Sequence, residues 1–234
     1  MLLVIEDLHA HYGKSHILHG VRLQVDAGEI VCLLGRNGVG KSTTLKTIMG
    51  LVAPSRGSVA FKGSEIAGLA SYHIARLGLG YVPEERRIFP TITVRENLLM
   101  GMKVGAARNG GWTLERVYEF FPRLRERDRQ RAGTLSGGEQ QMLTIGRTVM
   151  GNPELLLVDE PTEGLAPMII EQVERILSEI HRGGTPVLLV EQSMETAMAL
   201  AQRVYVMSKG QIVFSGSMRE LEANDAVRKQ YLEV

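Results

Sequence analysis

A glycine-rich segment at residues 35–42, GRNGVGKS, most constrains what this chain can fold into. It fits the pattern GxxxxGK[ST] in full, follows the apolar run 30–34 and precedes a helix-like stretch at 43–49. A strand, a glycine loop and a helix in this order form the structural context that the pattern requires. The segment therefore predicts an α/β fold with a phosphate-binding loop between a strand and a helix.

The residues of this segment suit that chemistry. Glycines let the backbone curl until successive N–H groups point at one anion, and the positive end of the following helix adds to the attraction. Lys41 can reach the β- and γ-phosphates of a nucleotide as a catalytic point charge, and the Ser42 hydroxyl is placed to bind Mg²⁺. A glycine-rich turn without chemistry is the alternative, but it would not need every fixed position filled. The candidate nucleotide-binding residues here are Gly35, Asn37, Gly38, Gly40, Lys41, Ser42 and Thr43.

A second candidate element is an acidic strand end. The apolar run 155–158 is followed by Asp159 and Glu160, and ligands of open α/β sheets bind at the carboxyl ends of strands. We expect Asp159 to hold Mg²⁺, directly or through water, and Glu160 to polarise the water that attacks the γ-phosphate. An apolar run can also end in acidic residues simply because it meets solvent. Beside residues 35–42, the acidic pair favours a site that hydrolyses a Mg²⁺-nucleotide.

Composition excludes several other classes. Lys and Arg number 27 against 26 Asp and Glu, a net charge of +1, so no overall basic field indicates binding to nucleic acid. The hydrophobic content of 44% is typical of a globular domain. The single cysteine, Cys32, excludes an intrachain disulfide, and no Cys/His cluster predicts a metal site. We therefore expect a reducing compartment, the cytoplasm.

The apolar runs predict strands and not membrane spans. Residues 1–7 lack a basic region and turn acidic after four apolar residues, which indicates a first strand and not a signal peptide. Runs such as 31–34 and 155–158 are far shorter than the roughly 18 residues that cross a bilayer. Any membrane process would be served through other chains.

Strand-like and helix-like segments alternate along the chain, which predicts a single α/β domain over 1–234. We assign a core with a mixed sheet and an antiparallel β lobe to about 1–93 and 150–217, an inserted helical subdomain to about 94–149, and a C-terminal helix to about 218–234. The expected strands are 4–9, 21–25, 30–34, 57–61, 79–82, 155–159 and 187–191, with a closing hairpin at 204–214. The expected helices are 43–49, 94–102 and 114–129, with a glycine-rich break at 105–111.

The segment 135–141, LSGGEQQ, is not required by phosphate-loop chemistry in general. Ser136, Gly137 and Gly138, before a helix expected to begin near Glu139, would form a second anion-binding helix N-terminus. A Ser-capped helix is the alternative. The segment resembles the signature motif of ABC-type ATPases, and its order after 35–42 and before Asp159 matches that family. In the family the signature of one subunit caps the ATP held by another, so the resemblance implies a head-to-tail pair.

Further segments are similar to the LivF type, the ATP-binding subunits of branched-chain amino acid importers. They are residues 81–90, 139–143, 164–167 and 190–192. Tyr12 falls where the family places an aromatic ring against adenine, although a lone aromatic residue is often packing. Residues 163–167 replace the usual Ser-Ala-Leu-Asp segment. Residues 36–39 and 161–164 also resemble urea and amide importer ATPases, so the solute stays open.

Two positions depart from the general ABC pattern. Glu84 stands where most members have the glutamine that senses Mg²⁺ and the γ-phosphate, and Gln192 stands at the switch histidine. A carboxylate can bind Mg²⁺ but repels phosphate, whereas Gln192 can donate to the γ-phosphate but cannot titrate near neutral pH. Both substitutions are usual in the LivF type, so the resemblance implies a working site with Glu84 as a nucleotide and Mg²⁺ contact and Gln192 as a catalytic residue.

The resemblance implies an ATPase with ATP and Mg²⁺ as cofactors, peripheral on the cytoplasmic side of the bacterial inner membrane. It implies two transmembrane permease subunits, a second ABC ATPase and, indirectly, a periplasmic substrate-binding protein as partners. Residues 86–90 and the helical region correspond to the part that docks a permease, with a solvated loop as the alternative. The charged run 123–131 is a solvated helix face and not a nucleic-acid site. The other hypotheses are a soluble ABC-type ATPase acting on ribosomes or DNA, and a regulator that binds ATP without turnover.

Overall fold

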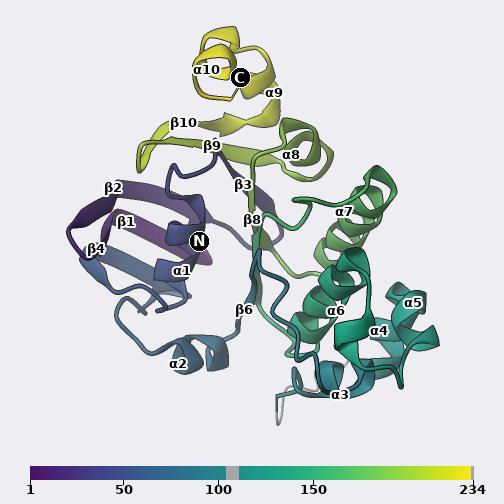
Figure 1. Ribbon diagram of the computed structural model, residues 1–234. Coiled ribbons are helices and arrows are strands. Elements are labelled where there is room, and N and C mark those ends of the chain that lie inside the picture. Colours follow the sequence, from purple (N-terminus) through teal and green to yellow (C-terminus); the bar gives the residue numbers. More distant parts are fainter. Residues whose placement is uncertain (104–110, 233–234) are drawn as a thin grey trace.

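The structure, a computed structural model, describes residues 1–103 and 111–232. Its central sheet has the strand order β10-β9-β3-β8-β7-β6 (Figure 1). The five strands β9, β3, β8, β7 and β6 are parallel to one another, whereas β10 pairs antiparallel with β9 at the edge of the sheet. Its strands are β3 (Ile30–Leu34), β6 (Leu79–Val82), β7 (Leu155–Asp159), β8 (Val187–Glu191), β9 (Arg203–Ser208) and β10 (Gln211–Ser217). The predicted mixed sheet is confirmed.

A second sheet is antiparallel throughout, in the order β2-β1-β4-β5. Its strands are β1 (Leu3–Tyr12), β2 (Ser15–Val25), β4 (Pro54–Phe61) and β5 (Ser64–Glu65). The expected antiparallel lobe is therefore present, but β1 and β2 extend well beyond the predicted 4–9 and 21–25. Their extra residues pair across the hairpin, from His9 opposite His19 to Tyr12 opposite Ser15, and polar residues in that stretch concealed the alternating pattern of a strand.

Alternate residues of the central sheet face two separate cores. Val31 and Leu33 of β3 pack with α1 (Lys41–Ile48) and the antiparallel sheet, whereas Cys32 and Leu34 pack with helices on the opposite face. All four side chains are fully buried. A strand covered on both faces has the continuous apolar sequence seen here, and the buried Cys32 is a free thiol.

Helices α3 to α7 lie on one side of the central sheet, opposite the antiparallel sheet (Figure 1). The helices after α1 are α2 (Ser71–Arg76), α3 (Val94–Leu99), α4 (Leu114–Phe120), α5 (Pro122–Glu126), α6 (Gly137–Val149), α7 (Pro167–Arg182), α8 (Met194–Leu200), α9 (Met218–Glu222) and α10 (Asp225–Tyr231). Among residues 1–103 and 111–232, every helix is too short or too polar to span a bilayer.

Several predicted helix limits were wrong. The helix expected over 114–129 is divided at Phe121, whose extended backbone (φ −125°, ψ 67°) precedes Pro122, because a residue before proline avoids the helical region. Helix α6 starts at Gly137, two residues before the expected Glu139. One C-terminal helix was expected, but α9 and α10 are separate and Asn224 caps the second. The predicted glycine-rich break lies outside the described residues except for Gly111.

Candidate functional site

The candidate site lies where three neighbouring parallel strands end. β8 runs between β3 and β7, with Leu34 opposite Glu191 and Asp159 opposite Val190. The loop after β3 and the acidic end of β7 therefore open at the same edge of the sheet, as ligand sites of open α/β sheets do. This register explains how residues more than a hundred positions apart in the sequence become neighbours.

The glycines after β3 are needed for the shape of the loop. Gly40 has φ 114° and directly precedes α1, and Gly38 has φ 78° with open space where a Cβ would stand. A Cβ on Gly35 would lie 2.5 Å from the carbonyl oxygen of Met207 in β9. The loop can therefore lie against β9 and curl back to the helix only with glycine at these positions.

Lys41 is the first residue of α1, and its ammonium group is almost excluded from solvent. The Nζ atom donates to the carbonyl oxygens of Gly35 (2.8 Å) and Arg36 (3.0 Å) and lies 2.9 Å from Glu160 Oε1. Glu160 comes directly after β7 and has a left-handed backbone (φ 41°), a conformation uncommon for a residue with a side chain. The turn therefore aims a buried carboxylate at the buried ammonium of the phosphate loop.

A cleft of about 190 Å³ opens over this loop. Its lining combines the loop and the start of α1 with Glu160 and with the ends of β1 and β2: Tyr12, Ile17, Gly38, Gly40, Lys41, Ser42, Thr43 and Glu160. Tyr12 is about half exposed, so part of its side chain is available to a ligand in the cleft. The lining thus offers a cation and helix N–H groups on one wall and an aromatic ring on another.

Asp159, the last residue of β7, is completely buried. Its Oδ2 accepts a hydrogen bond from the Tyr81 hydroxyl (2.9 Å), whereas Oδ1 is buried and has no hydrogen-bond partner within residues 1–103 and 111–232. Burial raises the pKa of Asp159, and the nearby Ser42 hydroxyl partly offsets that rise. An orphaned carboxylate oxygen beside a serine hydroxyl is a set of oxygen donors that suits Mg²⁺.

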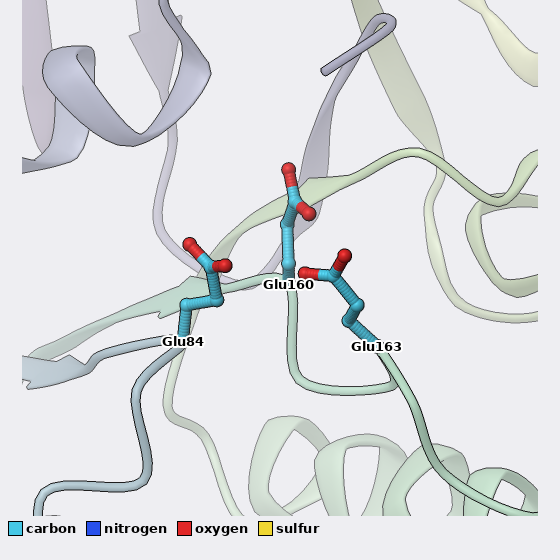
Figure 2. A group of neighbouring side chains, drawn as sticks. All are labelled: Glu84, Glu160 and Glu163. Carbon is cyan, nitrogen blue, oxygen red and sulfur yellow. The ribbon is translucent and has the colours of Figure 1, made fainter. Parts of the chain in front are cut away.

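Three carboxylates gather beside this point, with Glu160 between Glu84 and Glu163 (Figure 2). One oxygen from each lies within 4.8 Å of the others. Partial burial and the charges of Glu160 and Glu84 raise the pKa of Glu163, because like charges disfavour the ionised form. The cluster can bind a cation or share a proton, and it places Glu84 beside the residue after β7.

A buried carboxylate at the end of β8 connects two loops. Glu191 Oε1 accepts from the Thr162 hydroxyl (2.7 Å), and Oε2 accepts from the backbone N–H of Gln192 (3.0 Å). Burial raises the pKa of Glu191 despite these bonds. The loop after Glu160 and the backbone at Gln192 are therefore held together, while the Gln192 side chain is exposed.

The start of α6 is a complete capping box. Ser136 Oγ accepts from Glu139 N (3.3 Å), and Glu139 Oε2 accepts from Ser136 N (2.9 Å). Gly138 packs against α7, since a Cβ there would lie 2.9 Å from Ile169 Cγ2. Ser136 itself is exposed. The start of α6 therefore packs against α7 at Gly138 and is accessible to a partner at Ser136.

Arg86 connects this helix start to the acidic cluster. Its Nη2 donates to the carbonyl oxygen of Glu163 (2.9 Å), and its Nη1 lies beside Gly137, where a Cβ would approach to 2.5 Å. The Arg86 backbone is left-handed (φ 44°). The segment after β6, the start of α6 and the loop after β7 therefore meet at one guanidinium group.

A family model described as "ABC transporter" matches residues 18–163. The chain belongs to the ABC transporter family. It is 46% identical over 231 residues to the high-affinity branched-chain amino acid transport ATP-binding protein BraG of Pseudomonas aeruginosa, with 99% of both chains covered. A probable branched-chain amino acid transport ATP-binding protein LivF of Archaeoglobus fulgidus is 34% identical, with 95% of this chain and 94% of that chain covered.

A solved ABC transporter cassette has the same fold. The crystal structure, in an ADP conformation, superposes with a TM-score of 0.80 at 27% identity and covers 95% of this chain and 93% of that chain. The predicted ABC ATPase fold and the resemblance to the LivF type are thus confirmed, and the chain is an ATPase of this family.

The ABC cassette brings most, but not all, of the predicted site residues together. Seven residues line or abut the cleft as expected, namely Tyr12, Gly38, Gly40, Lys41, Ser42, Thr43 and Glu160, with Asp159 behind Ser42. Gly35 is buried under the loop, and Asn37 is exposed at its outer side. Ser136, Gly137, Gly138 and Gln192 do not line the cleft of their own chain.

Sequence analysis missed three residues of the site. Glu163 was noted only within segments compared with related families and not as a site residue, although an acid three residues after Glu160 was a usable signal. Tyr81 and Arg86 act through contacts to Asp159 and to the Glu163 carbonyl, respectively. No local pattern marks such contacts, because they depend on how β6 and β7 pair.

Proposed function

We propose that this ATPase energises the import of branched-chain amino acids through a membrane ABC transporter. The observation that carries the proposal is the buried Lys41 and Glu160 pair beside a cleft that also holds Tyr12 and the start of α1. The full-length similarity to BraG supports the solute class.

The nucleotide is expected to bind with its adenine ring on Tyr12 and its phosphates on the loop 35–42. Lys41 then exchanges Glu160 for the β- and γ-phosphates, because the phosphates offer more negative charge than one carboxylate. Glu160, released from the ammonium, accepts a proton from the water that attacks the γ-phosphate. Gln192 follows a carboxylate-anchored turn at the end of β8 and can donate an amide hydrogen to the same phosphate.

Ser42 and Asp159 are the proposed Mg²⁺ ligands, with Glu84 beside them. The free Oδ1 of Asp159 supports this choice. A Mg²⁺ ion bound there would neutralise part of the negative charge of the phosphates. Tyr81 fixes the other oxygen of Asp159, and so orients the carboxylate toward Ser42.

A second ABC ATPase, either a related chain or a copy of this one, is proposed to complete the site. The exposed Ser136 and the two glycines after it form a helix N-terminus that does not line the cleft of their own chain. A head-to-tail pair would place the start of α6 of one subunit over the γ-phosphate held by the other, where N–H groups attract an anion. ATP binding would then close the pair, and hydrolysis would reopen it.

An exposed apolar surface on the helical side is the proposed contact with two transmembrane permeases. Phe89 is 46% exposed and Met100 is 64% exposed. Asn97 holds the Phe89 backbone at both its N–H (2.9 Å) and its carbonyl (3.0 Å), so an exposed aromatic side chain is presented by a fixed backbone. This surface would hold the chain to the cytoplasmic face of the inner membrane. A periplasmic binding protein would deliver solute to the permeases on the opposite side.

The experiment is purification of the chain from its native membranes in mild detergent, with mass spectrometry of what co-purifies. We expect two permeases and a second ATPase. After reconstitution in vesicles with the accompanying binding protein, ATP should drive uptake of leucine, isoleucine or valine. Uptake of urea or an amide, without uptake of these amino acids, would show that the proposed solute is wrong. Ribosomal or DNA-bound partners without a membrane protein would contradict the proposal that the chain belongs to an importer.

The isolated subunit offers a further check on the importer proposal. Recognition of the amino acid belongs to the binding protein and the permeases, so calorimetry should detect no binding of leucine to this chain alone. Heat of binding from leucine at the isolated subunit would contradict the proposed division of labour.

A further inference from the structure

Four of the six histidines of the chain meet on the β1–β2 hairpin, outside the nucleotide cleft. His9 and His11 stand two positions apart on β1, and they pair across the sheet with His19 and His16, respectively. Residues two apart on a strand point to the same face. Folding thus makes a cluster of imidazoles from positions whose spacing in the sequence predicts no metal site.

His16 is the centre of this cluster. Its ring centroid lies 3.9 Å from that of His19, 4.1 Å from that of His11 and 5.2 Å from that of His9. Its ring therefore lies against imidazole groups from both strands of the hairpin, and imidazole nitrogens are common ligands of transition-metal ions.

Two of the histidines are already oriented by a second hydrogen bond. Asp7 Oδ1 lies 3.3 Å from His9 Nε2, and Arg56 pairs with the other oxygen of Asp7 (3.0 Å). A carboxylate only accepts, so the ring proton of a neutral His9 stays on Nε2 and the lone pair is on Nδ1. His11 Nδ1 lies 3.0 Å from the Ser55 hydroxyl. Carboxylate–histidine pairs of this kind hold metal ligands in place.

The second ring nitrogen of His9, Nδ1, faces another imidazole nitrogen. His9 Nδ1 lies 3.0 Å from His16 Nε2. Two nitrogens that bind one tetrahedral Zn²⁺ at about 2.0–2.1 Å are separated by roughly 3.3 Å. A shift of a few tenths of an ångström would therefore admit a metal ion in place of the proton that now lies between the two rings.

We propose that His9, His11 and His16 bind one divalent transition-metal ion of the zinc class on the β1–β2 hairpin, with His19 within reach as a fourth imidazole. Imidazole nitrogens suit Zn²⁺, Cu²⁺ and Ni²⁺, whereas Mg²⁺ prefers oxygen. The His11 and His16 rings are stacked at 7° and must turn to point at one ion. Both side chains are exposed, and the turn replaces the present ring stacking and the His11–Ser55 hydrogen bond with bonds to the metal ion.

The site is separate from the chemistry of ATP hydrolysis, although it lies on the hairpin whose β1 ends at Tyr12. The proposal does not depend on the transported solute or on the acidic cluster at Glu84. Its failure and the failure of the importer proposal are therefore distinguishable, since one is tested by metal binding and the other by transport.

The test is calorimetric titration of the full chain with ZnCl₂ in buffer that contains excess Mg²⁺, which occupies oxygen sites such as the Glu84 cluster. We expect one Zn²⁺ per chain, and an affinity at least about tenfold weaker in the double variant His9→Gln, His16→Gln. His73→Gln, at an exposed histidine on α2, is the matched control and should bind as the parent does.

Spectroscopy with Cu²⁺ as probe identifies the donor atoms. Nitrogen hyperfine splitting in the electron paramagnetic resonance spectrum should be present in the parent chain and lost in the double variant. Circular dichroism of the metal-free double variant checks that it folds. Equal affinity of parent and double variant, or Zn²⁺ binding that is abolished by Glu163→Gln instead, would overturn the proposal.

Discussion

Lys41 Nζ and Glu160 Oε1 lie 2.9 Å apart, with side chains only 2% and 8% exposed. The pair joins the phosphate loop to the acidic end of β7. Removal of one member of a buried pair usually leaves an uncompensated charge, but Lys41 retains two carbonyl acceptors from its own loop. When a nucleotide breaks the ion pair, the ammonium of Lys41 therefore keeps hydrogen-bond partners. For the same reason, we expect the chain to stay folded when Glu160 is substituted.

The first prediction concerns that carboxylate. Glu160→Gln should bind ATP but hydrolyse it at least about 100-fold more slowly, because an amide cannot accept the proton of the attacking water. Steady-state phosphate release and equilibrium ATP binding separate the two effects. Glu171→Gln, an exposed substitution on α7, serves as control, and an unchanged rate in Glu160→Gln would remove Glu160 as the general base.

A second prediction separates helix capping from nucleotide contact at Ser136. Ser136 and Ser217 begin α6 and α9 with the same capping box. Loss of either hydroxyl should cost about 1 kcal/mol, a fall in Tm of roughly 2–4 °C for a chain of this size. Only Ser136→Ala should also lower the ATPase rate of the assembled transporter. Equal ATPase rates in Ser136→Ala and Ser217→Ala would mean that Ser136 only caps its helix and does not contact the nucleotide.

A third prediction follows from the crowded carboxylates around Glu163, whose pKa is raised from its ordinary value of 4.5. The folded chain then binds this proton more tightly than the unfolded chain. Stability must therefore fall as pH rises from 4.5 through the folded pKa, and the loss is complete above it. Glu163→Gln should raise Tm at pH 7.5 and leave it unchanged at pH 4.

The expected rise is at most about 4 °C, since an exposed charge interaction is worth no more than about 1 kcal/mol. Thermal melts without Mg²⁺ measure it, because a bound cation would offset the repulsion. Glu171→Gln is again the control and should shift Tm equally at both values of pH. A lower Tm for Glu163→Gln at pH 7.5 would mean that the carboxylate stabilises the fold.

A fourth prediction tests the permease contact with two similar aromatic residues. Phe89 and Tyr72 are 46% and 57% exposed, and an arginine lies over each ring, at 4.9 Å for Arg147 and 5.7 Å for Arg76. Phe89→Ser should reduce co-purification with the permeases at least about tenfold, a loss of the size expected for a central interface aromatic. Tyr72→Ser should leave it unchanged, and a similar loss in both variants would place the interface elsewhere.

Local patterns in the sequence predicted the centre of this molecule well. Residues 35–42 and the acidic residues at the end of strand 155–159 could be placed from the sequence, because each group directly follows a strand that its apolar residues reveal. The break at Pro122 was missed although the proline was visible, since the charged residues after it continue a helical composition. The extended β2 was missed because its histidines and Ser15 gave no apolar alternation.

The rest of the site depends on contacts between distant segments. Glu163 lies near Glu84 because β6 and β7 are neighbours in the sheet. The sequence of neither segment predicts this strand order. The histidine cluster shows the same limit, since the register of a hairpin pairs His9 with His19 and His11 with His16. Motifs predict the chemical groups of a site, whereas pairing of strands decides which additional groups surround them.

The position of Arg86 has a mechanical consequence. One guanidinium group holds the carbonyl of Glu163 and lies against Gly137, and its own backbone continues to the exposed Phe89. If Phe89 contacts a permease as proposed, its displacement reaches Arg86 through three residues of backbone, and Arg86 contacts both the loop after β7 and the start of α6. In the proposed transporter, Arg86 would therefore transmit a movement at the permease contact to the acidic cluster over only a few residues.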